Sequence, residues 1–315
     1  MAFIPTPKYD RDKKRMAKML SKQYKQMFDY LLLQLQFNPD DPKVIREAQI
    51  MRQINYWLKE LDQALYKEIE KLIKKSFQDG QAYHLLSVKE AKNWEEAVSS
   101  ASFNKLQRAR IKAIVADTHG DILQATNNTS SAIKSVVRQT VSKVAQYHSL
   151  NNGNYKDMQK GLLKQLSKQG LSKTIVKEGF VGIKDRAGRK WDLATYSKMV
   201  VTTKTNQAFI EGVTHESEET GFDLAVITDH GAEDACKNWE GLVISLTGKT
   251  KGYITYKQAK ATNEIFHPNC EHGVHSIRSL DMLPADEIAQ HRRKMAQIGS
   301  VESRKYVKKR KKKAG

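Results

Sequence analysis

Apolar residues recur at steps of three and four along the first part of the chain, a spacing that predicts amphipathic helices. Over residues 10–37 the apolar stripe consists of Met16, Leu20, Tyr24, Met27, Leu31 and Leu35. Over about 42–78 a second stripe keeps a near-heptad spacing through Met51, Ile54, Leu58, Leu61, Leu65, Ile69 and Leu72. We interpret both stripes as core-facing, and we expect the two segments to pack as an antiparallel helical hairpin.

Turn and capping residues divide the rest of the helical region. Asp79-Gly80 predicts a break or bend at the end of the second helix. The Asn-Asn-Thr run at 127–129 is typical of a helix start, and the Asn-rich run at 151–154 is typical of a loop. The helices expected beyond the break therefore cover about 88–98, 101–118, 129–148 and 155–169.

After residue 177 the pattern changes from helical spacing to short extended runs. Val181 and Ile183 precede turn residues at 185–188, and Trp191 follows them. This arrangement predicts a small β-hairpin.

A further helix and several short strands are expected after the hairpin. Asp192 is placed to cap a helix over about 194–219, and Gly221 is placed to end it. The pattern then predicts strands at 224–230, 241–248 and 252–256 and a last helix at 280–296. Strands and helices in this order indicate an α+β module.

These elements together predict a mainly α protein with a small α+β domain near its end. We expect four parts: a long N-terminal helical hairpin (1–80), a helical region or bundle (81–177), a small α+β domain (178–285), and a helix end with a basic disordered tail (286–315).

The charge balance narrows the classes of partner. The 315 residues include 54 Lys and Arg against 35 Asp and Glu, which gives a formal net charge of +19 and a pI of about 9.7. A net positive charge of this size favours binding to polyanions, nucleic acid above all. No apolar run approaches the roughly 20 residues that span a bilayer, and we expect neither a membrane-spanning segment nor a secretory signal. With two cysteines, a reducing compartment fits best.

Basic residues concentrate in two places. The first half of the first helix carries Lys13, Lys14, Arg15, Lys18, Lys22 and Lys25. The tail carries eight basic side chains without an acid between them: Arg304, Lys305, Lys308, Lys309, Arg310, Lys311, Lys312 and Lys313. Like-charge repulsion keeps such a tail extended, and we expect it to bind DNA without sequence preference. A nuclear localisation signal is the alternative interpretation.

Histidines and cysteines gather in the α+β module. The candidate metal ligands are His230, Cys236, His267, Cys270 and His272, with His275 as a further one. Zinc takes four nitrogen or sulfur ligands, but the two cysteines stand far apart and form no C-x2-C pair. The spacing leaves three alternatives open: a zinc site, a Cys236–Cys270 disulfide, or thiols and imidazoles that only pack. We therefore assign no cofactor, with zinc as the one to test.

The same segment raises the question of an enzyme. Asp229-His230 together with His267 and Asn269 is similar to the pattern of ββα-metal nucleases, in which a His acts as general base beside a metal. The paired CxxC knuckles expected there are missing. Cys236 stands among acids, which raise a thiol pKa and disfavour a nucleophile, and no phosphate-binding glycine motif is present. We expect no enzyme, and keep a metal-dependent nuclease or a nucleic-acid-binding module as alternatives.

Five motifs follow one another between residues 187 and 277, and their order can be compared with that of known families. In sequence these are AGRKWDLATYSKMV, TKTNQAFIEG, ETGFDLAVITDHGAEDACKNWEGLVIS, YITY and HPNCEHGVHSI. This order resembles the phage minor capsid protein 2 family, which is related to head morphogenesis proteins of the Mu F type. The matching positions include Asp229, Trp239, Gly241 and Asn269, which mark a compact domain fold in that family. The chain departs from the pattern at Thr202 and around 233–236, where Arg and His are expected.

The resemblance implies a structural minor head protein of a tailed phage. Its implied partners are the phage portal protein, packaged double-stranded DNA and the major capsid protein. The implied location is the virion, inside the capsid near the portal, with the host cytoplasm during assembly. The implied role lies in head assembly and in genome packaging or ejection.

Overall fold

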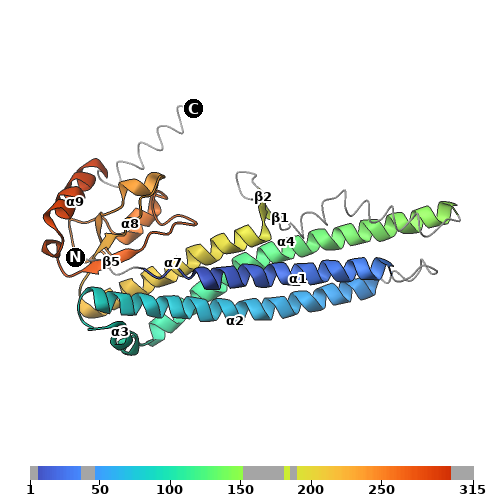
Figure 1. The fold of residues 1–315 in the computed structure, drawn as a ribbon, viewed down its shortest axis with the longest axis horizontal. Coiled ribbons are helices and arrows are strands. Elements are labelled where there is room, and N and C mark those ends of the chain that lie inside the picture. The colour runs from blue at the N-terminus through green and yellow to red at the C-terminus, as the bar shows by residue number, and fades with distance from the viewer. Residues whose placement is uncertain (1–5, 37–46, 152–180, 185–189, 299–315) are drawn as a thin grey trace. The chain divides into compact units, whose positions relative to one another are not determined.

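The computed structural model describes residues 6–36, 47–151, 181–184 and 190–298, and these are mainly helical (Figure 1). The helices are α1 (Asp10–Gln36), α2 (Glu47–Ser87), α3 (Trp94–Ser100), α4 (Lys105–Asn151), α7 (Leu193–Thr220), α8 (Tyr256–Ala261) and α9 (Ala285–Ile298), with short 3-10 helices η3 (Ala235–Asn238) and η4 (Leu280–Met282). The strands are β1 (Val181–Lys184), β2 (Lys190–Asp192), β3 (Leu224–Ile227), β4 (Val243–Ser245) and β5 (Val274–Ile277). The predicted fold class is therefore confirmed.

The chain divides into two compact units. Unit 1 comprises Met1–Tyr9, Glu70–Val115 and Val201–Gly315, and unit 2 comprises Asp10–Ile69 and Ala116–Val200. The four-part division expected from the sequence stays a prediction.

In unit 2, α1 and the first part of α2 bury the apolar stripes seen in the sequence. Met16 and Leu20 of α1 are buried, as are Ile54, Leu61, Leu65 and Ile69 of α2. Figure 1 shows α1 beside α2, with the two helices running in opposite directions. Arg15 forms an ion pair with Glu68 between them. The antiparallel hairpin is confirmed. On its basic face Lys14, Arg15, Lys18 and Lys22 are exposed, whereas Lys13 is 8% exposed.

The helices that follow α2 differ from the prediction in their bounds. A single helix, α4, replaces the two expected at 101–118 and 129–148. Ala125 and Thr126 are buried in it, and Thr126 Oγ1 donates to the Ile122 carbonyl at 2.9 Å. Burial of this face outweighs the weak helix propensity of the Asn-Asn-Thr run at 127–129. The helix expected at 88–98 begins later, because Asn93 caps α3 by accepting from Glu96.

In unit 1, α2 continues through Asp79-Gly80 to Ser87, so the predicted break there was wrong. Gly80 marks a close crossing of α2 and α7 instead. A Cβ on Gly80 would lie 2.1 Å from the Phe209 carbonyl oxygen, and a Cβ on Gly212 would lie 2.0 Å from that of Phe77. Glycine serves here because it lets two helix backbones approach, and not because it ends a helix.

The three-stranded sheet of unit 1 has the order β4-β3-β5, with both pairs antiparallel. Ala225, Ile227 and Ile244 share one core with Phe209 of α7 and the fully buried Trp239. The opposite side chains of the strands form a second core, which contains Leu224, Val226, Val243, Ile277 and Leu283. Because both faces of the sheet are covered, the central strand β3 is a continuous apolar run and does not alternate with polar residues.

Two parts of the sheet prediction need correction. Residues 252–256 form no strand; Thr255 makes only an isolated bridge to Ser245 and otherwise caps α8. Its side chain accepts from the Gln258 N–H, and the Gln258 side chain accepts from the Thr255 N–H, so a capping box replaces strand pairing. The third strand is β5, which lies inside the His-rich segment and was not predicted as a strand.

The hairpin and the helix after it agree with the sequence. β1 pairs antiparallel with β2, with Ile183 opposite Trp191. α7 ends at Thr220, and Gly221 follows with a φ of +78°. The helix expected at 155–169, the turn at 185–188 and the basic tail lie outside the described residues. Within the described residues, no helix is long and apolar enough to cross a membrane.

Candidate metal centre

The candidate ligands come from two segments of unit 1 beside the sheet. The first segment follows β3 and contains η3, which carries Cys236. The second segment, residues 262–273, connects α8 to β5 and carries His267, Cys270 and His272. Neither segment contains a helix longer than one turn, so side-chain hydrogen bonds to the backbone set their shape.

Two aspartates shape the first segment. Asp234 accepts the backbone N–H of Cys236 at 2.9 Å and caps η3. Asp229 accepts the N–H of Gly231 at 3.0 Å, in a turn where Gly231 has a φ of +73°. These local bonds turn the chain after β3 so that the Cys236 side chain is buried.

The motif His-Pro-Asn-Cys in the second segment encodes a tight turn. The Cys270 N–H donates to the His267 carbonyl at 3.0 Å, which closes a turn with Pro268 second and Asn269 third. Asn269 has a φ of +65°. Proline at the second position and a left-handed Asn at the third are typical of a type II turn.

Helix α7 holds this turn in place. Asn206 Nδ2 donates to the carbonyls of Cys270 at 3.3 Å and His272 at 2.7 Å. Thr203 Oγ1 accepts the N–H of Asn269 at 2.9 Å. The loop that carries two of the candidate ligands is therefore fixed to a helix that also supports the sheet.

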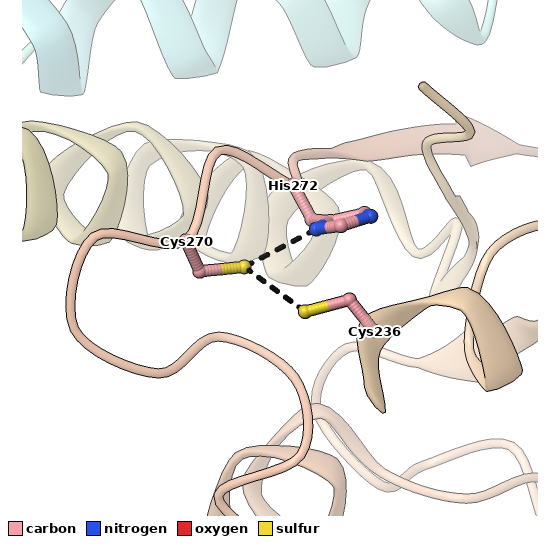
Figure 2. A group of neighbouring side chains, drawn as sticks. All are labelled: Cys236, Cys270 and His272. Carbon is pink, nitrogen blue, oxygen red and sulfur yellow. Dashed lines mark hydrogen bonds between the residues drawn. The ribbon is translucent and has the colours of Figure 1, made fainter. Parts of the chain in front are cut away.

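The cysteine and histidine side chains converge in a buried cluster (Figure 2). Cys236 Sγ lies 3.9 Å from Cys270 Sγ, and Cys270 Sγ lies 3.2 Å from His272 Nδ1. The three residues are between 2% and 4% exposed. Their ligand atoms all lie within 4.8 Å of one another, a spacing that can hold a metal ion.

His267 and His230 lie beside this trio, each in a group of its own. His267 Nε2 lies 3.1 Å from Cys236 Sγ and 3.2 Å from Asp234 Oδ2, and these three residues form a second possible ligand group. His230 is exposed and groups with Glu240 and His272, its ring centroid 4.0 Å from that of His272. All five predicted ligands thus share one neighbourhood, although as placed they form overlapping groups of three. That they bind a metal stays a prediction.

The structure separates His275 from the cluster. It lies on β5, where its Nδ1 is 3.0 Å from the Tyr83 hydroxyl of α2. Burial lowers the pKa of His275 to about 4. This histidine is therefore neutral at pH 7 and belongs to the packing of α2 on the sheet.

Glu240 is a further member of the site that sequence reasoning missed. Its Oε1 accepts the backbone N–H groups of His230 at 3.1 Å and Ala232 at 2.9 Å, and lies 3.0 Å from His272 Nε2. Burial alone would raise the pKa of this carboxyl, but the hydrogen bonds outweigh burial and lower it. The only signal was its place between Trp239 and Gly241, since nothing in a sequence separates a buried Glu from an exposed one.

Burial also dominates the electrostatics of the sulfur atoms. It raises the pKa of Cys236, with further contributions from Cys270 and Asp234, and it raises the pKa of Cys270. The sequence prediction that the acids raise the Cys236 pKa has the right sign, although burial is the larger cause. A thiol with a raised pKa is a poor nucleophile, which suits a binding or packing role.

The residues that resemble a nuclease do not form one group. Among the described residues, His230 and His267 belong to different sets of potential ligands. The Asn269 N–H binds Thr203, and its left-handed backbone belongs to the turn. The arrangement therefore does not place a general base and an amide around one shared metal position.

Two further motif positions, Trp239 and Gly241, have structural roles in the fold. Trp239 is fully buried, and its Nε1 donates to Glu264 at 3.3 Å. Gly241 has a φ of +73°, and its N–H donates to the Ile227 carbonyl at 2.9 Å. The eight basic residues of the tail lie outside the described residues.

Comparison with known proteins places the cysteine and histidine cluster inside a matched region. The family described as phage minor capsid protein 2 matches residues 42–312. This match confirms the family suggested by the motif order and extends it into the helical part of the chain. Neither the curated proteins nor the solved structures gave a match.

Proposed function

The chain belongs to the phage minor capsid protein 2 family and is thus a structural protein of the phage head and virion; from this premise we propose that it sits inside the capsid at the portal vertex and contacts packaged DNA. The match over residues 42–312 is the observation that carries the proposal. In that position the protein acts in head assembly and in genome packaging or ejection. Its proposed protein partners are the portal protein and the major capsid protein.

Charge supports the contact with DNA. The chain has a net charge of +19, and Arg11, Lys14, Lys18 and Lys22 are exposed at helical spacing on α1. The tail adds eight basic residues between Arg304 and Lys313. Neutralising phosphates releases counterions, so this kind of contact is independent of sequence and sensitive to salt.

We predict that deleting residues 304–315 weakens DNA binding and its salt dependence. If about half of the eight basic residues contact phosphates, the slope of log K against log salt falls in magnitude by about 4. The measurement is a titration of the full-length and shortened proteins with two unrelated duplexes at several salt concentrations. The two duplexes should bind alike.

Circular dichroism of the shortened protein provides the control, because all the described helices end before residue 304 and should stay folded. Equal affinity and equal salt slope for the two proteins would remove the tail from the proposed DNA contact. A strong preference for one duplex would contradict non-specific binding.

The interior location has its own test. In intact virions the protein should resist added protease, and it should become sensitive once the heads are opened and the DNA is released. The major capsid protein on the outer surface serves as the reference for exposure. Cleavage at the same rate before and after opening would place the protein outside the capsid.

A further inference from the structure

We propose that unit 1 binds one zinc ion through Cys236, Cys270, His272 and His267. The ion would join η3 to the 262–273 loop, two segments that carry cysteines 34 positions apart. The site is structural, because it fills four coordination positions with protein atoms and leaves none for a substrate.

The distances within the trio agree with tetrahedral zinc. Zinc bonds of about 2.3 Å to sulfur and about 2.0 Å to nitrogen place two sulfur ligands about 3.8 Å apart and a sulfur and a nitrogen about 3.5 Å apart. The observed separations are 3.9 Å for Cys236 Sγ to Cys270 Sγ and 3.2 Å for Cys270 Sγ to His272 Nδ1. Two buried sulfurs and an imidazole that meet at this spacing form most of a zinc site.

His267 is best placed to be the fourth ligand. Its Nε2 already lies 3.1 Å from Cys236 Sγ, and its side chain is 26% exposed, so a small rotation toward Cys270 meets little resistance. Asp234 also lies near, with Oδ2 3.2 Å from His267 Nε2 and Oδ1 accepting the Cys236 N–H. In the proposed site it caps η3 beside His267 and is not a ligand. His230 lies next to Glu240, whose nearest oxygen already takes part in three hydrogen bonds.

The hydrogen bonds of the two histidines direct the correct nitrogen toward the sulfurs. His272 Nε2 faces the Glu240 carboxylate, and His267 Nδ1 faces the Pro268 carbonyl at 3.0 Å. A carboxylate and a carbonyl only accept, so these nitrogens carry the ring protons. In the neutral ring of His272, Nδ1, which lies 3.2 Å from Cys270 Sγ, then has a free lone pair. His267 Nε2 lies 3.1 Å from Cys236 Sγ but also 3.2 Å from Asp234 Oδ2, so it must turn from that carboxylate toward the ion to offer its lone pair. A histidine that ligates a metal and donates its second N–H to an oxygen shows this arrangement.

The ligand loop benefits from being fixed by an ion. Asn263, Phe266 and Asn269 all have a positive φ within seven residues, an unfavourable conformation for Phe in particular. Metal binding that requires the folded arrangement contributes its free energy to folding. A zinc ion would therefore compensate for a loop with little regular secondary structure.

Metal analysis of the full-length protein, purified in reductant without chelators, tests the proposal. We expect one zinc ion per chain by mass spectrometry of the metal content. Cobalt substituted for zinc should give the intense tetrahedral spectrum and the thiolate-to-metal band expected for two cysteine ligands. Chelator should remove the ion and lower the melting temperature by about 10 °C.

Four variants separate ligands from neighbours. Cys270→Ser should lose the ion, and His267→Gln should bind it about 100-fold more weakly or worse, because losing only an outer partner already costs 10–100-fold. His230→Gln and Asp234→Asn are the matched controls and should keep it, since Asn still caps η3. If Cys270→Ser fails to fold, the cobalt spectrum of the wild type and the zinc affinity of His267→Gln, a change at a partly exposed position, still test the proposed ligands.

Three results would overturn the proposal. The first is wild-type protein that holds no zinc even after one equivalent is added. The second is a Cys236–Cys270 disulfide in protein kept in reductant. The third is zinc loss in the His230→Gln or Asp234→Asn control that equals the loss in His267→Gln.

Discussion

Replacing Gly212 by Ala is expected to destabilise unit 1 by about 3 kcal/mol or more. The added Cβ would lie 2.0 Å from the carbonyl oxygen of Phe77 and 3.2 Å from the Gln81 nitrogen. Both are backbone atoms of α2, so no side-chain rotation relieves the contact and the helices must separate. Separation would also strain the bond from Ser76 Oγ to the Thr205 carbonyl, 2.7 Å long and buried. Urea or thermal unfolding followed by circular dichroism measures the loss.

Gly120→Ala is the matched control, and it should not lower the free energy of unfolding. Gly120 lies inside α4, and a Cβ there would meet nothing within 4 Å. Alanine is the better helix former by up to about 1 kcal/mol, so this variant should be as stable as the wild type or more stable. A Gly212→Ala protein that also matched the wild type would show that α2 and α7 do not cross at this contact.

Asp223→Asn is expected to cost about 2–3 kcal/mol at pH 7. Asp223 is 6% exposed and accepts several hydrogen bonds from the end of β4 and the loop after it. Its carboxylate accepts from the Ser245 hydroxyl at 2.5 Å, from the Thr247 N–H and hydroxyl at 2.7 and 2.6 Å, and from the Thr250 N–H at 2.9 Å. An amide keeps one acceptor oxygen and places donor hydrogens against donors, so part of this set is left unpaired.

The cost of Asp223→Asn should depend on pH in a defined direction. Burial by itself would raise the pKa of Asp223, but the hydrogen bonds outweigh burial and lower it below the ordinary value of 3.8. A carboxyl whose pKa is lower in the folded state contributes stability that is fully present above its unfolded pKa. That contribution is lost as the pH falls through the folded pKa. The difference in unfolding free energy between wild type and variant should therefore shrink below about pH 4.

Asp229→Asn provides the comparison for Asp223. Asp229 is exposed and, within the described part of the chain, accepts one backbone bond, from Gly231. Its replacement should change stability by less than about 0.5 kcal/mol. Two results would contradict the role assigned to the hydrogen bonds of Asp223. One is an equal loss of stability at the two positions, and the other is a stability difference between wild type and Asp223→Asn that grows in acid.

Periodicity alone was sufficient for α1 and for the first part of α2. Ile54, Leu61 and Leu65 repeat at the spacing of one helix face, and each is buried where that spacing requires. The hairpin at β1 and β2 and the end of α7 at Gly221 also followed from local signals. These features depend on neighbours in sequence, so a pattern is enough to predict them.

Two of the errors arose where distant parts of the chain meet. Gly80 looked like a helix end, because a sequence does not show that the α7 backbone lies against it. Val274 and Ile277 looked like part of a histidine-rich loop, because β5 exists only through its pairing with β3. Glycine and short apolar runs have several local meanings, and only tertiary contacts choose among them.

The sequence by itself determined the helical class, the basic character and the residues from which a metal site could be built. Only the tertiary structure decided that Cys236 and Cys270 meet, that His272 joins them, and that His275 does not. The physical reason is that the ligands come from two loops whose paths are set by Asp234, Asn206 and Glu240. Spacing along the chain does not contain the distance between such loops, which depends on the packing of both against one sheet and α7.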